Sequence, residues 1–257
     1  MSGDCPRSDL SSDSLHCPPL RTLLRLDVSA NDARPDPAAD WIALAEAGLA
    51  AGCDAVLLPA GSAVPDPWIV AAVLVAALPE VRVMVTLQAG ALLPVAAAHL
   101  AQSLQSLSGG RALLACETDT PGVDASSSET AQLNRDQRLV RSVEFVSILR
   151  ALWSSPEPLQ HRGVYFRVEN GRLPDLTRQR PPLYWSVPAT STPVPPRRVL
   201  APYCDGLIEP THAGPELHAA IERAYRARGL RAPAPHDRLR HVRTFDVPLP
   251  TSRRPHT

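Results

Sequence analysis

Short apolar runs of strand length alternate with longer segments of helical periodicity along most of this chain of 257 residues. Strands are predicted at Thr22–Val28, Ala55–Pro59, Val81–Leu87, Arg111–Glu117, Val164–Val168, Pro182–Val187, Cys204–Glu209 and Val242–Leu249. Helices are predicted at Ala38–Ala51, Asp66–Leu78, Pro94–Leu107, Asp136–Trp153 and Pro215–Arg228. Asp66 is the expected N-cap of the second helix, and Val140 is expected to face inward from the fourth. Strands that alternate with helices favour a parallel sheet whose crossovers are right-handed.

The number of core strands decides between two architectures. A closed α/β barrel needs eight strands, and about six or seven core strands are predicted here. A doubly wound open sheet competes with the barrel, but no GxGxxG and no GxxxxGK[ST] follows any strand. We therefore predict an α/β fold, an incomplete (β/α)8 TIM-type barrel of parallel strands. The barrel domain spans residues 20–250, between a disordered tail at 1–19 and a basic tail at 251–257.

Charge and composition exclude several function classes. The 26 basic and 26 acidic residues cancel, so no general affinity for nucleic acid or for an anionic membrane is expected. Pro65, Asp66 and Pro67 interrupt the longest apolar run, and the first residues lack the apolar core of a signal peptide. A cytoplasmic protein is the expectation. The five cysteines match no zinc pattern, and no HxH or HExxH occurs, so no metal site is predicted.

Several stretches carry a resemblance to a known family. They include AEAGLAAGCDAVLLPAG at 45–61, PVAAAHLAQSLQSLSGGRALL at 94–114 and PPLYWS at 181–186. In their order and spacing they resemble the luciferase-like, flavin-dependent monooxygenases, closest to the alkanesulfonate monooxygenase branch. The resemblance implies that FMN binds at the C-terminal ends of the barrel strands. A separate reductase would supply the reduced FMN, which reacts with oxygen and a small organic substrate; the branch suggests a sulfonate.

The resemblance also implies site residues. Gly61, Gln88, Thr118, Arg138 and Ser186 take the places of cofactor-binding residues. Ser186 stands where the family has a Gly-Gly-Ser-Ser run near the phosphate, so it either binds the phosphate or is an ordinary loop residue.

Two further residues are candidates for catalysis, and each has an ordinary alternative. Glu117 is either a general acid with a raised pKa or a strand-end carboxylate that is solvated or paired with an Arg. Arg243 is either a clamp for a substrate anion or part of the basic tail, and a shifted register would bring His241 to the site instead.

The same alignment shows departures from the family pattern. Val64, Ala115, Leu139, Val187 and Phe245 stand where the family or its branch has flavin or substrate contacts. Two hypotheses follow: an FMN-dependent monooxygenase with a weakened site, or a non-catalytic homologue that serves as a binding or partner subunit. An open barrel would leave two strand edges unpaired, so we expect a homodimer or pairing with a longer homologue.

Overall fold

The computed structural model describes residues 20–26, 36–61, 64–117, 133–174, 180–186, 200, 202–210, 214–234 and 238–244. The two predicted tails, at 1–19 and 251–257, lie outside these ranges, as do Thr118, Val187 and Phe245. Within them, no helix combines the length and the apolar character that a membrane span requires.

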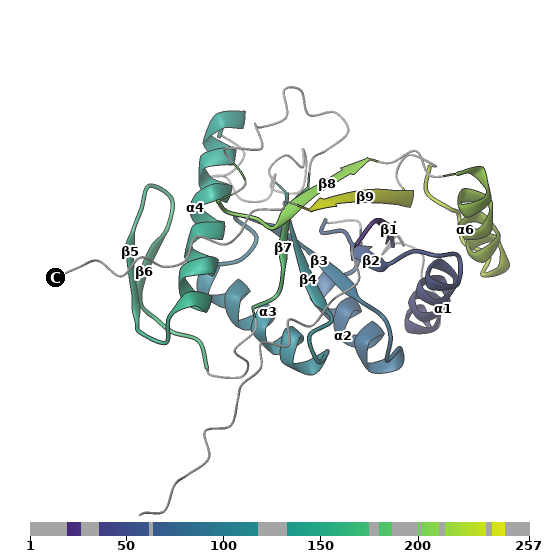
Figure 1. The fold of residues 1–257 in the computed structure, drawn as a ribbon, viewed down its shortest axis with the longest axis horizontal. Helices are drawn as coiled ribbons and strands as arrows, with labels where there is room; N and C mark the ends of the chain where they lie inside the picture. The colour runs from purple at the N-terminus through teal and green to yellow at the C-terminus, as the bar shows by residue number, and fades with distance from the viewer. Residues whose placement is uncertain are drawn as a thin grey trace, which may run out of the picture.

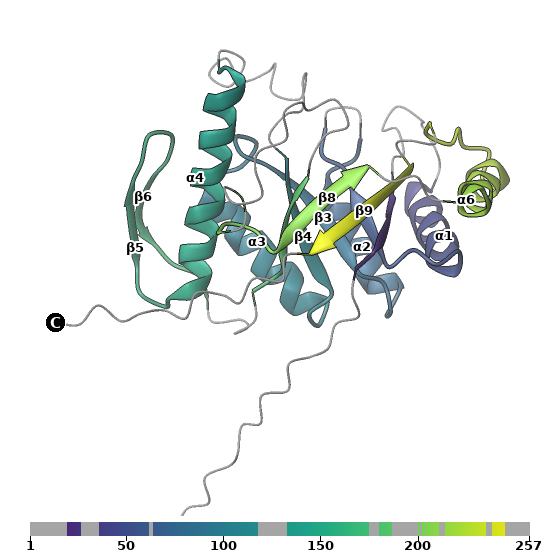
Figure 2. The same cartoon turned by 45° about the horizontal axis from the view of Figure 1, so that its top comes forward.

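Seven strands form a closed barrel at the centre of the molecule (Figures 1 and 2). In their order around the barrel they are β1 (Thr22–Arg25), β2 (Ala55–Leu58), β3 (Val83–Gln88), β4 (Ala112–Glu117), β7 (Leu183–Ser186), β8 (Gly206–Pro210) and β9 (Leu239–Thr244). Neighbours from β1 to β8 pair in parallel. The α/β barrel and the count of six or seven core strands are confirmed.

The last strand corrects two expectations. β9 pairs antiparallel with both β8 and β1, so the strands are not all parallel. Its residues Leu239 and Val242 lie opposite Leu24 and Ile208, so neither β1 nor β8 has the unpaired edge expected of an open barrel. The sequence could not reveal this, because an alternating pattern reads the same in either strand direction.

Four helices pack around the parallel strands and a fifth lies beside them. They are α1 (Pro37–Ala50), α2 (Pro67–Ala77), α3 (Pro94–Leu107), α4 (Arg135–Ser154) and α6 (Pro215–Ala227). α6 packs against α1 next to the antiparallel strand (Figure 1). The helix starts have local causes: Pro37, Pro67 and Pro94 each take the first helical position, where a missing N–H costs nothing.

The barrel has an inner and an outer core. Leu23, Leu57, Met84, Leu113 and Ile208 belong to the inner cluster, where alternate residues of each strand meet. A larger outer cluster lies between the strands and the helices. Val140 was predicted to face inward from α4, but its side chain is 52% exposed, so that prediction is wrong.

A β-hairpin replaces the single strand predicted at Val164–Val168. β5 (Leu159–Arg162) and β6 (Arg167–Gly171) pair antiparallel outside the barrel, beside α4 (Figure 2). The Glu144 carboxylate of α4 accepts hydrogen bonds from the backbone N–H groups of residues 164, 165 and 166 in the hairpin turn. Glu144 therefore fastens the hairpin to the helix.

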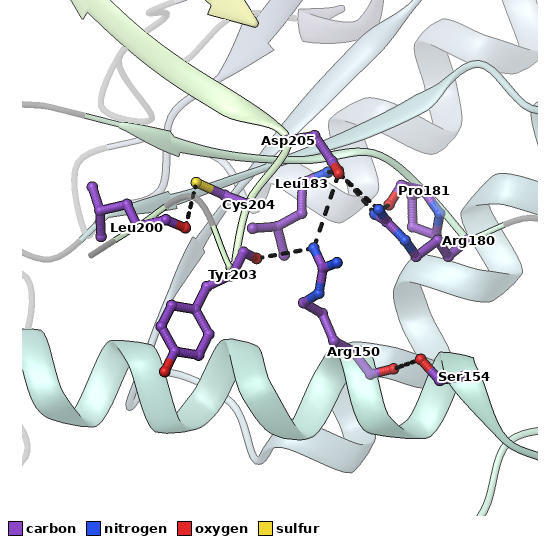
Figure 3. A network of polar contacts seen from close by, with 9 residues as sticks. All are labelled: Arg150, Ser154, Arg180, Pro181, Leu183, Leu200, Tyr203, Cys204 and Asp205. Carbon is purple, nitrogen blue, oxygen red and sulfur yellow. Dashed lines mark hydrogen bonds and ion pairs between the residues drawn. The ribbon is translucent and has the colours of Figure 1, made fainter. Parts of the chain in front are cut away.

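A network of ion pairs and hydrogen bonds lies at the end of the barrel where the parallel strands begin (Figure 3). Asp205, directly before β8, accepts two hydrogen bonds from the Arg180 guanidinium at 2.7 and 2.8 Å and one from the Leu183 N–H at 2.8 Å. Arg150 of α4 reaches the same network by donating to the Tyr203 carbonyl at 3.3 Å. Burial raises the pKa of Asp205, but the hydrogen bonds and charge of Arg180 outweigh this effect and lower it. Charged hydrogen bonds therefore link α4, the segment before β7 and the segment before β8 at this end of the barrel.

Candidate functional site

Polar side chains mark the opposite end of the barrel, where the parallel strands finish. Gln88 of β3 lies in register with Glu117 of β4, which lies in register with Ser186 of β7. The Ser186 hydroxyl donates a hydrogen bond of 3.3 Å to a Glu117 carboxylate oxygen. Three predicted site residues therefore meet at the edge where barrel enzymes hold their active sites.

A cavity of about 630 Å³ opens beside this edge, at the ends of β2 and β3. Predicted cofactor-binding residues Gly61 and Gln88 both line it. Most of its wall is apolar and comes from the strand ends, the starts of α2 and α3, and α4: Ala60, Val64, Pro67, Trp68, Ile69, Leu87, Ala91, Leu92, Ala97, Leu100 and Phe145. This size and character suit a small organic molecule.

Thr86 adds an unusual polar group to the cavity wall. Its side chain is 2% exposed, and its hydroxyl has no hydrogen-bond partner among the residues that the structure describes. A buried hydroxyl without a partner costs free energy, which a bound molecule would recover by hydrogen-bonding to it. Thr86 is therefore the clearest candidate for a ligand contact.

Asp66 is the one ionisable residue among the described residues of the cavity wall. Its carboxylate caps α2 by accepting hydrogen bonds from the N–H groups of Trp68 at 2.9 Å and Ile69 at 3.2 Å. The sequence predicted this cap, and the structure confirms it. Because its own carboxylate occupies this helix start, α2 offers little to a second anion.

The turn after β3 forms another part of the wall. Gly90 has a φ of +137°, which side chains other than glycine rarely adopt, and the Ala91 N–H donates to the Gln88 carbonyl. A Cβ on Gly90 would lie 3.2 Å from the Arg141 guanidinium of α4. Arg141 also lies over the Phe166 ring, at 5.5 Å from its centroid. The turn and α4 are therefore closely packed behind the cavity.

The other predicted site residues lie elsewhere. Arg138 is in the first turns of α4, where it donates to the Leu133 carbonyl at 2.7 Å and helps to start the helix. The backbone of Arg243 pairs with Leu207, near the start of β8 and so toward the other end of the barrel from Glu117. The structure does not bring the backbone of Arg243 to Glu117, and Thr118 lies outside the described residues.

The described cysteines are buried thiols rather than nucleophiles. Burial raises the pKa of Cys53 and of Cys204 to about 12, and it raises the pKa of Cys116 as well. These thiols stay protonated at neutral pH. In the described part of the chain, no three His, Cys, Asp or Glu side chains gather in a way that could hold a metal ion.

Sequence reasoning identified Gln88 and Gly61 but missed Thr86, Trp68 and Phe145. Thr86 carries a signal of its own, because Thr86 and Gln88 are polar residues two positions apart at the end of an otherwise apolar strand. Residues at i and i+2 share one face of a strand. Phe145 gives no such signal, since an aromatic residue on an inward helix face is expected in any core.

Comparison with known proteins finds one matching family model and several similar solved structures. The model of the family described as luciferase-like monooxygenase matches residues 21–247. EDTA monooxygenase (EmoA) from Chelativorans sp. BNC1 superimposes with a TM-score of 0.60 and 22% identity, over 81% of this chain and 59% of that one. An F420-dependent secondary alcohol dehydrogenase, solved with an F420–acetone adduct, superimposes with a TM-score of 0.58 and 19% identity, over 81% of this chain and 64% of that one.

A third solved structure also contains a cofactor. It is the oxygenating constituent of 3,6-diketocamphane monooxygenase from the CAM plasmid of Pseudomonas putida, in complex with FMN. It superimposes with a TM-score of 0.58 and 14% identity, over 83% of this chain and 64% of that one. The chain thus spans less than two thirds of the length of each of these three relatives.

Proposed function

The chain belongs to the luciferase-like monooxygenase family, and from this premise we propose that it binds the ring of FMN in the cavity at the ends of β2 and β3. With reduced FMN from a separate reductase, it would act as an oxidoreductase that uses oxygen on a small organic substrate. The observation that carries this proposal is the unpartnered, buried hydroxyl of Thr86 in an apolar cavity at the C-terminal ends of the strands. The alkanesulfonate branch remains a prediction from the sequence resemblance.

The residues of the cavity fit the ring of a flavin. An isoalloxazine ring is flat and largely apolar, with carbonyl and ring-nitrogen groups along one side. Leu87 and Phe145 offer apolar surface to its faces, while the Thr86 hydroxyl and the Gln88 amide can hydrogen-bond to its polar side. A flavin phosphate needs cationic or N–H donors, and the described wall contains no Arg or His, so the phosphate would have to bind outside this wall.

The mechanism divides the work between the cofactor and the chain. A bound reduced flavin supplies the electrons for oxygen chemistry. Thr86 and Gln88 would hold the ring in one orientation, and the apolar wall would exclude water from the reacting atoms. Glu117, hydrogen-bonded to Ser186 at the adjacent strand ends, is placed to exchange a proton at that edge. As a proposal, Glu117 is the general acid or base, and Arg243 has no assigned step.

Titration of FMN into the full chain tests the proposal. We expect quenching of flavin fluorescence at micromolar FMN, with F420 titrated in parallel. Thr86→Val removes one hydrogen bond, so it should weaken FMN binding by roughly three- to tenfold, in line with about 0.5–1.5 kcal/mol for such a bond. Arg226→Ala, on the exposed face of α6, is the control and should leave binding unchanged.

Two outcomes would contradict the proposal. If flavin fluorescence were not quenched at tens of micromolar FMN, the chain would lack the micromolar affinity for FMN that the proposal requires. Equal FMN binding by Thr86→Val and by the unmodified chain would place the ring elsewhere. If FMN binds, a reductase assay should then show oxygen consumption that depends on the added organic substrate.

The second candidate function is a non-catalytic homologue that acts as a binding or partner subunit. The lack of a cationic side chain in the described cavity wall favours it, because an FMN phosphate would find no counter-charge there. A homodimer or a pair with a longer homologue also stays a prediction, although the pairing of β9 with β1 removes open edges as its reason. A folded oligomer that binds no flavin would support this candidate.

A further inference from the structure

The cavity contains no positive charge in the part of its wall that the structure describes. Its one ionisable residue is Asp66, whose carboxylate lies at the start of α2. The neighbouring wall is formed by Val64, Trp68 and Leu92, which are apolar. Arg141 lies close to the turn behind the cavity, but it is packed over Phe166 and is not part of the wall. In the described part of the wall, a ligand therefore meets apolar surface and one carboxylate, that of Asp66.

The apolar surface continues from the cavity toward solvent. Ile69 on α2 and Leu100 on α3 both line the cavity, and their side chains are 62% and 39% exposed. Large aliphatic side chains that are exposed together beside a cavity commonly mark a binding site for an apolar ligand. A molecule with an aliphatic portion would cover them as it enters.

These features discriminate between neutral and anionic ligands. An anion would lose its hydration without gaining a counter-charge, and it would lie near the Asp66 carboxylate. A neutral apolar molecule gains from burial of its hydrocarbon part. In the flavin-free chain, its one polar group, a hydroxyl or a carbonyl, can hydrogen-bond to the buried hydroxyl of Thr86, which would otherwise contact the flavin ring.

We propose that the cavity selects neutral, apolar organic molecules that carry one uncharged polar group and rejects organic anions, sulfonates included. This inference rests on the proposed function in so far as the selected molecule is the one that reacts. Selection itself needs no flavin. The inference differs from the resemblance to the alkanesulfonate branch, which suggests a sulfonate substrate.

Calorimetric titration of two probes of equal chain length tests the inference. The full chain, without flavin, is titrated with 1-octanol and with 1-octanesulfonate. We expect 1-octanol to bind at least tenfold more tightly, which corresponds to about 1.4 kcal/mol. Equal or tighter binding of the sulfonate would overturn the inference, and so would the absence of heat from 1-octanol at millimolar concentration.

A pair of variants on one helix tests the location. Leu100→Arg places a guanidinium at the cavity, on a partly exposed position of α3 where Arg is a good helix former. It should reduce the preference for 1-octanol at least threefold by improving sulfonate binding. Leu107→Arg, on the same helix but outside the cavity wall, adds the same charge and should leave the preference unchanged. Equal effects of the two variants would contradict the assignment.

The two proposals can fail separately. Loss of the preference for 1-octanol with intact FMN binding overturns the substrate class alone. Absence of FMN binding with an intact preference overturns the flavin function, while the cavity keeps its assigned selectivity.

Discussion

Thr86 shows how a single buried group can oppose stability and favour binding. Its hydroxyl lies in the cavity wall without a partner among the described residues, and the side chain is 2% exposed. A buried polar group of this kind costs about 1–3 kcal/mol relative to a satisfied one. The same hydroxyl contributes favourably to the free energy only when a ligand hydrogen-bonds to it.

The free energy of unfolding gives a prediction for this residue. Thr86→Val keeps the branched shape and removes the hydroxyl, so it should stabilise the ligand-free chain by about 1 kcal/mol. Urea denaturation followed by circular dichroism measures the change. A loss of more than about 1 kcal/mol would mean that the hydroxyl has a protein partner and contributes to folding.

At the residue level, the family resemblance names Gly61 and Gln88 as cofactor-binding residues, and their binding of a cofactor stays a prediction. Gly61 and Gln88 line the cavity, and Asp66 caps α2 as predicted. Arg138, which the resemblance also names, lies outside the described wall of the cavity and donates to the Leu133 carbonyl in the first turns of α4. Contacts across the barrel depend on tertiary placement, which a local pattern does not contain.

At the scale of elements, the hairpin beside α4 depends on one carboxylate. Glu144 accepts hydrogen bonds from the Phe166 N–H at 2.9 Å and from the His161 ring at 3.1 Å. A Cβ on Gly163 would lie 1.9 Å from the Glu144 carboxylate, so a side chain at this position would displace that carboxylate. Partial burial raises the pKa of Glu144, but the hydrogen bonds from Phe166, His161 and Tyr165 outweigh this effect and lower it.

A lowered pKa in the folded state predicts how pH affects the hairpin. The carboxylate stabilises the fold above its unfolded pKa of about 4.3, and this contribution is lost as pH falls through the lower folded value. Glu144→Gln should therefore destabilise the chain by about 1–3 kcal/mol at pH 7. The difference from the unmodified chain should shrink between about pH 5 and pH 3.

Urea midpoints across this pH range measure the difference. Glu169→Gln on β6 is the control, since its carboxylate is 56% exposed and pairs only at the surface with Arg167. Its midpoint should differ little from that of the unmodified chain at any pH. If the difference in urea midpoint between Glu144→Gln and the unmodified chain stayed constant from pH 7 to pH 3, the ionised carboxylate of Glu144 would not be what stabilises the hairpin.

Element boundaries were predictable where caps and prolines mark them. The helix predicted at Pro94–Leu107 forms with those bounds, and the one predicted at Asp66–Leu78 forms as Pro67–Ala77. The hairpin was not predicted, because LQHR and RVENG contain few apolar residues to signal strands. The direction of β9 was not predictable either, since the pairing partners that set it lie far away in the sequence.

For the whole molecule, the two ends of the barrel have different roles. The ends of the parallel strands border the cavity, and their beginnings carry the Asp205 network (Figure 3). Asp205 and Arg180 are only 26% and 24% exposed, so solvent screens their interaction incompletely. Stability and ligand binding should therefore respond to different substitutions.

Asp205→Asn tests this separation. The amide cannot match the paired hydrogen bonds to Arg180, so we expect a loss of about 1.5–3 kcal/mol in unfolding free energy. Ligand affinity in the cavity should remain within twofold of the unmodified chain at temperatures where the variant is folded. Asp36→Asn, where Asn is an equally good helix cap, is the control and should change stability little. A matched loss of ligand affinity in Asp205→Asn would show that the two ends are coupled.

The antiparallel direction of β9 also has a practical consequence. Thr244 lies opposite Gly206, the first residue of β8, so the chain leaves the barrel at the end away from the cavity. A parallel final strand would instead have ended at the same end of the barrel as Gln88. The last described residue therefore lies behind the barrel, and we expect the cavity to stay accessible when the protein is held on a sensor surface through a C-terminal affinity handle.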